Sequence, residues 1–212
     1  MPSESLVTEA APLPAALAFL PPTLRVQTKQ LDVSGGTVLF RTGDRPVLLY
    51  YVLRGQLALV RHARNGRKIV LQHASRGFVA EASVESPRYH CDGLARAESR
   101  VCALPMSAFR QALCDDPDFR NAWGRQLAGE IRKLRAQSER LRLHNAEERI
   151  VHCIESDGVK GSLILDQPLN AWALELGLTH EALYRALARL ARSGRLQRQG
   201  HVLRLQYRDQ LA

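Results

Sequence analysis

Residues 174–187 read LELGLTHEALYRAL, and this run determines how the C-terminal third of the chain is interpreted. It predicts a helix over residues 169–176, a tight turn at Gly177 and a second helix over residues 179–193. Two short apolar runs separated by Gly200 follow, and they are typical of a hairpin. A helix, a glycine turn, a second helix and a hairpin in this order predict a winged helix-turn-helix.

The second of these helices has two contrasting faces. Leu183, Leu187 and Leu190 recur at helical spacing and predict the buried face. The opposite face and the hairpin carry polar and basic side chains, and we expect these residues to contact double-stranded DNA: Thr179 (also the N-cap), His180, Glu181, Tyr184, Arg185, Arg189, Arg192 and Arg198. Arg can form two hydrogen bonds to guanine and Glu can accept one from cytosine, which suits the helix to a major groove. The alternative is a surface helix with a solvated charged face.

The net charge of the chain favours an acidic partner. Its 212 residues include 30 Lys and Arg against 21 Asp and Glu, which gives +9 and a pI near 9.9. Such an excess points to nucleic acid or to an anionic membrane surface. Residues 10–22 are apolar but interrupted by prolines and too short to span a bilayer, and residues 1–9 lack the basic residues of a signal peptide. We therefore expect a cytoplasmic protein without a membrane partner.

Short apolar runs alternate with turn signals from Leu31 to Leu104. Asn65-Gly66 lies between two of these runs and is a strong hairpin signal. Short strands with a turn roughly every 8–12 residues predict a sandwich or a barrel. Helical patterns begin near Ser107, so the predicted fold class is α+β. The predicted strands are residues 37–40, 48–53, 56–60 and 68–71, with a last pair within 93–104.

A long helix follows this segment, and Asp115-Asp116-Pro117-Asp118 is typical of a helix start. Its apolar positions are spaced 4, 3, 4 and 3 apart, with Ser138 as one polar member of the seam: Leu127, Ile131, Leu134, Ser138 and Leu141. This heptad spacing predicts pairing with the same helix of a second copy. The positions outside the seam are heavily charged, with Arg140 among them, which favours a narrow paired seam over burial in a deep core. The alternative is a helix that packs on its own domain.

The order of these parts resembles the Crp–Fnr (cyclic-AMP receptor protein) superfamily of transcription regulators. The resemblance covers residues 28–205, and the segments that carry it are 39–44 (LFRTGD), 49–56 (LYYVLRGQ), 65–68 (NGRK) and, most specifically, 174–187. Residues 1–24 are rich in Ala, Pro and Leu and are interpreted as an N-terminal arm. The resemblance implies a double-stranded β-roll sensor of the cyclic-nucleotide-binding jelly-roll type (25–114), a dimerisation helix (115–145) and a winged helix-turn-helix (146–212). It also implies a homodimer, not an enzyme, that binds a near-palindromic promoter site, with RNA polymerase as a partner if it activates.

The resemblance also assigns residue roles. By motif match, His180, Glu181 and Arg185 take the base-reading positions, and His180 stands where the family usually has Arg. Members that bind cyclic nucleotides have a Phe-Gly-Glu turn and then an Arg-Ser pair, in which Gly admits the phosphate, Glu binds the ribose and Arg neutralises the phosphate. Here the turn is Phe78-Val79-Ala80-Glu81, and the Arg-Ser place falls on Cys91-Asp92 or, shifted by one residue, on His90-Cys91.

The phosphate arginine is therefore absent, and Arg88 is the nearest substitute. We expect a degenerate effector pocket around Glu81, Arg88, His90 and Cys91 that does not bind cyclic AMP in the usual pose. Because the first cysteine is Cys91, an N-terminal iron–sulfur cluster is excluded on ligand count. The cofactor is thus unknown, and the other cysteines, Cys102, Cys114 and Cys153, are interpreted as small buried apolar residues.

Other functions stay open at this point. His90 and Cys91 could bind haem or a transition metal, or Cys91 could sense oxidants as a thiolate; the alternative is an ordinary strand that alternates between core and solvent. A cupin-like β-barrel enzyme would need a cluster of metal ligands, but the barrel segment contains only His62, His73 and His90 and no His-x-His pair. An architectural DNA-binding protein without an effector is a further alternative.

Overall fold

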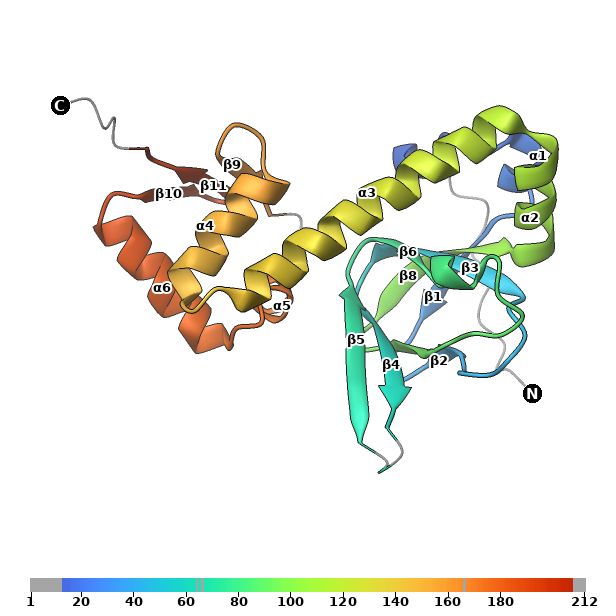
Figure 1. Ribbon diagram of the computed structural model, residues 1–212, viewed down its shortest axis with the longest axis horizontal. Coiled ribbons are helices and arrows are strands. Elements are labelled where there is room, and N and C mark those ends of the chain that lie inside the picture. The colour runs from blue at the N-terminus through green and yellow to red at the C-terminus, as the bar shows by residue number, and fades with distance from the viewer. Residues whose placement is uncertain (1–12, 64, 66, 166, 208–212) are drawn as a thin grey trace. The chain divides into compact units, whose positions relative to one another are not determined.

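The computed structural model describes residues 13–63, 65, 67–165 and 167–207 (Figure 1). The chain divides into two compact units, Met1–Gly124 and Arg125–Ala212. The boundary lies inside the long helix α3 (Pro117–Arg142), so the helix that we expected as a separate segment is shared between the units. Gly66 of the expected hairpin, Arg208 and the first half of the expected arm lie outside the described residues.

The first unit is built around two four-stranded antiparallel sheets, which together form the expected β-roll (Figure 1). One sheet has the order β1-β8-β3-β6 and the other the order β2-β7-β4-β5. The hairpin at Asn65 joins β4 to β5, and His62 pairs with Lys68 at its end. The strands are β1 (Lys29–Val33), β2 (Val38–Phe40), β3 (Leu48–Arg54), β4 (Leu57–His62), β5 (Lys68–Ala74), β6 (Gly77–Val79), β7 (Asp92–Ala95) and β8 (Ser99–Pro105).

The described part of the expected N-terminal arm packs into this unit. Leu17 in the short 3-10 helix η1 (Ala15–Leu17), Leu20, and Leu24 in α1 (Pro22–Arg25) are fully buried. Phe19 stacks on Phe119 with 5.9 Å between ring centroids. The leucines of this segment therefore belong to the core, since their apolar surface is removed from water there.

Five aromatic side chains join β6, α2 (Met106–Asp115) and the start of α3. Phe78 of β6 lies edge-on to Trp123 of α3, with ring centroids 5.0 Å apart, and Phe109 of α2 lies 4.9 Å from the same indole. Phe119 and Phe19 extend the cluster. Edge-to-face contacts at these distances add to the stabilisation from burial alone.

The predicted start of the long helix is confirmed. The Asp116 carboxylate accepts a hydrogen bond from the Phe119 amide at 2.9 Å, and Pro117 occupies the first turn. Helical structure begins earlier, however, with α2 at Met106. The two helices α2 and α3 are separate because Asp116 has an extended backbone, as a residue before proline prefers.

The second unit contains three helices after α3 and a three-stranded sheet of order β10-β11-β9 (Figure 1). Its core is formed by one continuous cluster that includes Ile150, Trp172, Leu183 and Leu203. The elements agree closely with the predicted ones: α4 (Ala146–Asp157), β9 (Ser162–Ile164), α5 (Leu169–Glu175), α6 (His180–Arg192), β10 (Leu196–Gln199) and β11 (Val202–Leu205).

Among the described residues, no helix combines the length and the apolarity needed to cross a bilayer.

Candidate functional site

Helix α6 divides into a buried and an exposed face, as its sequence predicts. Leu183, Ala186, Leu187 and Leu190 are buried in the core of the second unit. The Thr179 hydroxyl accepts a hydrogen bond from the Ala182 amide at 3.1 Å and caps the helix. The exposed face of the first two turns carries these predicted residues: His180, Glu181, Tyr184 and Arg185. It therefore presents donors, acceptors and an aromatic ring to any partner.

A cavity of about 560 Å³ opens beside this face. It lies among the start of α5, the start of α6 and the β10–β11 hairpin. Its lining includes the predicted residues His180, Tyr184 and Arg198, and His180 and Tyr184 pack with ring centroids 4.5 Å apart. The other lining residues are Leu165, Gln167, Pro168, Leu169, Asn170 and His201. Sequence reasoning did not single out Asn170 or His201, because neither belongs to the α6 pattern.

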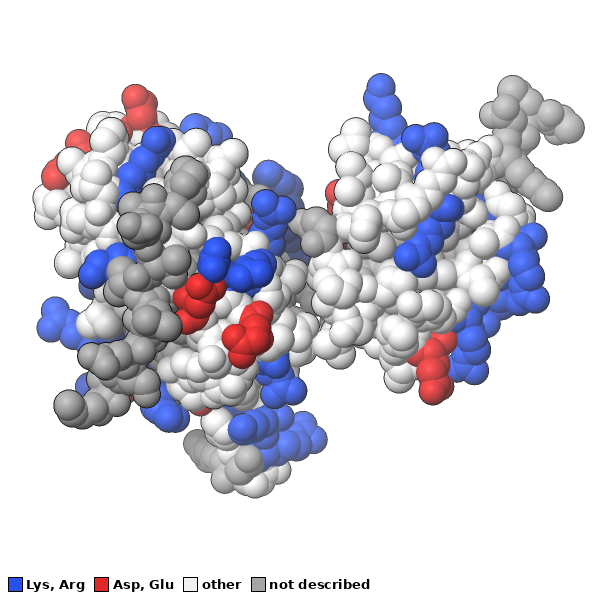
Figure 2. Space-filling view, turned by 180° about the vertical axis from the view of Figure 1, so that it is seen from behind, with Lys and Arg blue, Asp and Glu red and all other residues white. Residues whose placement is uncertain are grey.

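Two of the predicted basic residues are engaged within the chain. Arg189 forms an ion pair with Glu147 of α4 at 2.5 Å, and Arg195 approaches the same carboxylate at 3.7 Å. The Arg198 Nε donates to the Gly200 carbonyl at 3.2 Å and stiffens the hairpin. Arg185 and Arg192 remain exposed on α6. On the face drawn in Figure 2, the unit that contains α6 displays more Lys and Arg than Asp and Glu.

The turn after β6 adopts a backbone conformation that favours glycine. Ala80 has φ +72° and is buried, and the 3-10 helix η2 (Glu81–Ser83) follows it. An L-residue with a Cβ pays roughly 1–2 kcal/mol for the left-handed region. Arg110 of α2 fixes the far side of the turn, since its Nε donates to the Val84 carbonyl at 2.6 Å. The geometry supports Ala80 as the position that the family fills with glycine.

The four residues of the expected effector pocket have different environments. Arg88 is exposed, and its guanidinium donates to the Gly43 carbonyl at 2.6 Å. His90 is exposed with its Nδ1 3.4 Å from the Ser83 hydroxyl, whereas Cys91 is only 1% exposed. Glu81 begins η2 and is half-buried. Neighbouring residues 89–91 precede β7 (Asp92–Ala95) and lie outside a strand, but their side chains alternate between core and solvent.

The burial of Cys91 bears on whether this residue could sense oxidants or bind a metal. Burial raises the pKa of the Cys91 thiol to about 11, with Glu81 and Asp92 adding to the effect. A thiol with such a pKa is protonated at neutral pH and reacts slowly with oxidants. Among the described residues of the barrel, no three His, Cys, Asp or Glu side chains converge as metal ligands would. The raised pKa disfavours a thiolate sensor at Cys91.

The sequence matches one family model over the β-roll that contains Ala80 and the expected effector pocket. The match spans residues 30–116, and the family is the cyclic nucleotide-binding domain. Residues 30–116 are thus similar to a cyclic nucleotide-binding domain. The matched segment contains all eight strands of the β-roll except the first residue of β1, and it ends after α2. No curated protein matches the chain.

Solved structures extend the likeness beyond the cyclic nucleotide-binding domain. FixK2 from Bradyrhizobium japonicum is 20% identical with a TM-score of 0.61, over 85% of this chain and 93% of that one. The c-di-GMP responsive global regulator CLP from Xanthomonas campestris is 21% identical with a TM-score of 0.52, over 86% and 96%. A CRP-family transcriptional regulator from Thermus thermophilus is 21% identical with a TM-score of 0.50, over 82% and 90%. The predicted Crp–Fnr resemblance is confirmed at the level of the fold.

The apolar seam of α3 is exposed where the sequence predicts pairing. Ile131, Leu134 and Leu141 are about half exposed, and Leu127 is partly buried. Leu141 has a second role at the end of the helix. Gly177 has φ +64°, and a Cβ there would lie 2.6 Å from the Leu141 Cδ2. The seam therefore ends against the turn that precedes α6.

Arg140 departs from its predicted place on the outer face of α3. It is 1% exposed, and its guanidinium lies 2.6 Å from the Asp157 carboxylate and 3.6 Å from that of Glu175. The prediction was wrong because α4 and α5 cover the last turns of α3. A second correction concerns Cys114, which is exposed rather than buried.

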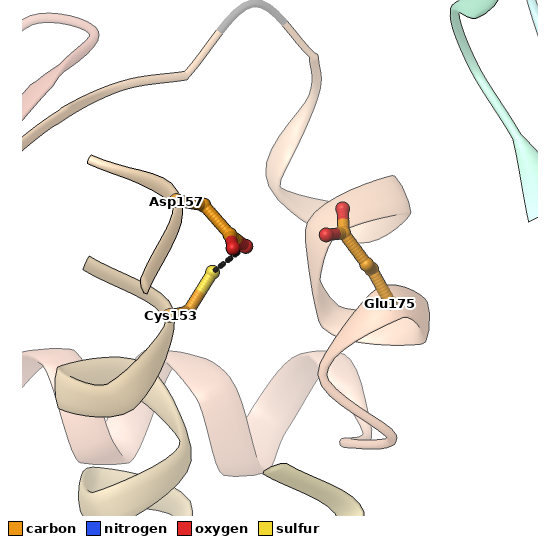
Figure 3. A group of neighbouring side chains, drawn as sticks. All are labelled: Cys153, Asp157 and Glu175. Atoms are coloured by element: carbon orange, nitrogen blue, oxygen red, sulfur yellow. Dashed lines mark hydrogen bonds between the residues drawn. The ribbon is translucent and has the colours of Figure 1, made fainter. Parts of the chain in front are cut away.

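The acids that bind Arg140 also lie beside Cys153 (Figure 3). The spacing of Cys153, Asp157 and Glu175 would allow a metal ion to be held. Burial, however, raises the pKa of the Cys153 thiol to about 12, and its sulfur accepts a hydrogen bond from the Trp172 indole at 3.4 Å. The cation that balances the two carboxylates is already supplied by Arg140. We therefore interpret the group as a buried ion-pair network.

Proposed function

We propose that the chain is a cytoplasmic, homodimeric, sequence-specific DNA-binding transcription regulator of the Crp–Fnr type, and not an enzyme. Residues 146–212 would act as a winged helix-turn-helix, with α6 in the major groove and the β10–β11 hairpin as the wing. The observation that carries the proposal is α6 itself, whose leucine face is buried while His180, Glu181, Tyr184 and Arg185 are exposed beside a cavity bordered by the hairpin. The transcription regulators with the same fold support it. RNA polymerase would be a partner if the protein activates.

The exposed residues of α6 would fall into two groups, those that contact DNA bases and those that contact DNA phosphates. Side chains near the N-terminus of such a helix reach base edges, so we assign base contacts to His180, Glu181 and Arg185. Arg192 lies in the last turn, where a guanidinium binds phosphate without reading sequence. Arg189 is tied to Glu147, so its contribution would come through the position of α6.

Two substitutions on α6 should therefore have different signatures. Arg185→Ala should lower the affinity for the preferred site by about 1–3 kcal/mol and relax the preference at one base position. Arg192→Ala should weaken all sequences alike and reduce the salt slope by about 1. The measurement is titration of each variant on the preferred site and on its single-base variants, after genome-wide DNA capture has recovered that site.

The control is Arg45→Ala, which removes the same charge from an exposed position in the other unit. It should leave both affinity and base preference unchanged. An Arg185→Ala protein that keeps the full base preference would contradict the assignment, and footprints without two-fold symmetry would contradict the homodimer.

The cyclic nucleotide-binding domain should not bind cyclic AMP in the family's usual pose. A buried phosphate needs a fixed cation, and the position of that cation falls on the buried Cys91 or, with a one-residue shift, on the exposed His90. Loss of the cation should cost about 2–5 kcal/mol, which corresponds to roughly 30- to several-thousand-fold in affinity. Ala80 adds a methyl group at the close approach of backbone to ligand. We expect calorimetry to detect no micromolar binding of cyclic AMP or cyclic GMP.

Arg88 gives this expectation a sharp test. To replace the missing cation, it would have to leave the Gly43 carbonyl. Micromolar binding that disappears in Arg88→Ala would show that Arg88 makes this move. Micromolar binding that survives in Arg88→Ala would overturn the alignment of residues 90–92 with the phosphate site.

A further inference from the structure

Arg149 of α4 holds three segments of the second unit together. Its Nε donates to the Leu143 carbonyl at 3.1 Å and its Nη2 to the Leu141 carbonyl at 3.3 Å, both at the end of α3. Its Nη1 donates to the carbonyls of Leu176 and Gly177 at 3.2 and 3.0 Å, in the turn before α6. One guanidinium thus bridges the end of α3 and the turn that starts α6.

Arg140 makes a second connection in this region, from α3 to the ends of α4 and α5. It projects from α3, and its Nη2 donates to the Asp157 carboxylate at the end of α4 at 2.6 Å. Its Nη1 lies 3.6 Å from the Glu175 carboxylate at the end of α5. The Arg140 side chain is almost completely buried, whereas each of the two carboxylates is about a third exposed.

The backbone of the turn at Gly177 lies close to both Arg149 and Leu141. A Cβ at Gly177 would lie 3.1 Å from the Arg149 Nη1 and 2.6 Å from the Leu141 side chain. The end of α3 is therefore packed directly on the turn. The contacts of Arg149, Arg140 and Gly177 hold the end of α3 against the turn before α6, and we call them the arginine joint. Without these contacts, the three-residue connection 143–145 between α3 and α4 would be free to bend.

We propose that Arg149, supported by Arg140, is a positioning residue that fixes the orientation of α6 relative to the end of α3. The inference rests on the proposed function, in which two copies pair through α3 and each α6 enters a half-site. The orientation of α6 relative to α3 then sets the distance and the rotation between the two α6 helices. The arginine joint would thus select the spacing of the half-sites, although neither arginine needs to touch DNA.

Arg149→Lys is the informative variant, because it keeps the charge and loses the planar fork that reaches four carbonyls. A two-base-pair change in the spacer rotates one half-site by about 70° relative to the other. The wild-type protein should lose roughly tenfold or more in affinity on such a site, since both halves can no longer be engaged together. Arg149→Lys should bind the original and the altered spacing within about threefold of each other, and should bind an isolated half-site as the wild type does.

A second measurement needs no DNA. Spin labels at Lys133→Cys in α3 and Ala188→Cys in α6, both exposed positions, report the distance between the two helices within one protomer. Cys114, which is exposed, is replaced by Ser, and labelled protein is diluted with unlabelled protein. The distance distribution should be narrow in the wild type and clearly broader in Arg149→Lys. If Arg149→Lys does not fold, Glu175→Gln weakens the same joint and takes its place.

Arg132→Ala is the matched control, because it removes an exposed arginine from α3 away from the joint. It should keep the wild-type spacing preference and distance distribution. A narrow distribution or an intact spacing preference in Arg149→Lys would overturn the positioning role, and so would an equal loss on the half-site and the palindrome. A wild-type protein that binds no DNA, with labels that respond to Arg149→Lys as expected, would overturn the proposed function and leave the joint standing.

Discussion

Ile131→Glu combined with Leu134→Glu is expected to convert the protein to a monomer and to lower its affinity for a palindromic site roughly a hundredfold or more. Both side chains are about half exposed in the single chain, at 50% and 47%. Because only about half of each side chain remains to be buried, pairing with a second copy would contribute about 0.7–1.5 kcal/mol for each side chain. Glutamates would face each other across the seam and repel. Sedimentation velocity measures the oligomeric state, and titration with a palindromic duplex measures affinity.

Arg132→Glu provides the control, because Arg132 lies on α3 outside the 4-3-4-3 seam. It changes the charge of the helix by two units and should leave the dimer intact. A dimer that survives the double substitution would place the interface elsewhere. A monomer that keeps the full affinity for the palindrome would show that pairing contributes nothing to DNA binding.

Arg140→Met is expected to have the largest effect on stability of any single substitution in the second unit. It removes the Arg140 guanidinium that Asp157 and Glu175 share. Removing one partner of a fully buried pair costs about 3–5 kcal/mol, and because each carboxylate here is about a third exposed we expect about 2–4 kcal/mol. Urea unfolding in a Trp123→Phe background follows this unit alone, since Trp172 is then the only tryptophan.

Arg142→Met is the matched control, because Arg142 is exposed two residues further along the helix. It should change the free energy of unfolding by less than about 0.5 kcal/mol. Adding Asp157→Asn to Arg140→Met should recover part of the loss by removing one uncompensated charge. A loss below about 1 kcal/mol for Arg140→Met would show that the network contributes little beyond its packing.

Patterns of short range predicted most of this fold. Asn65-Gly66, the glycine turn at Gly177 and the leucines of α6 each act within a few residues, so their signals survive in the bare sequence. The strands and helices predicted from them lie within a few residues of the observed ones. The exposed polar face of α6 was predictable for the same reason, since amphipathic spacing separates buried from exposed positions.

Contacts between distant segments account for what was missed. The heptad pattern placed Arg140 outside, but its burial depends on Asp157 and Glu175, 17 and 35 residues away. Arg189 looked available for DNA until α4 brought Glu147 beside it. Arg149 had no local signal, because its partners are backbone carbonyls that any residue supplies. Charge patterns along one helix do not report which other helix will cover it.

The aromatic contact between Phe78 and Trp123 has a consequence for mechanics. Phe78 precedes the strained Ala80 by two residues, and its ring meets the Trp123 indole edge-on. Close-packed interiors have low compressibility, so Phe78 cannot be displaced far unless the indole and Phe109 also shift. The turn after β6 and the first turns of α3 are therefore stiffly coupled. A local force on that turn would be transmitted to the helix as a displacement, with little of it absorbed between them.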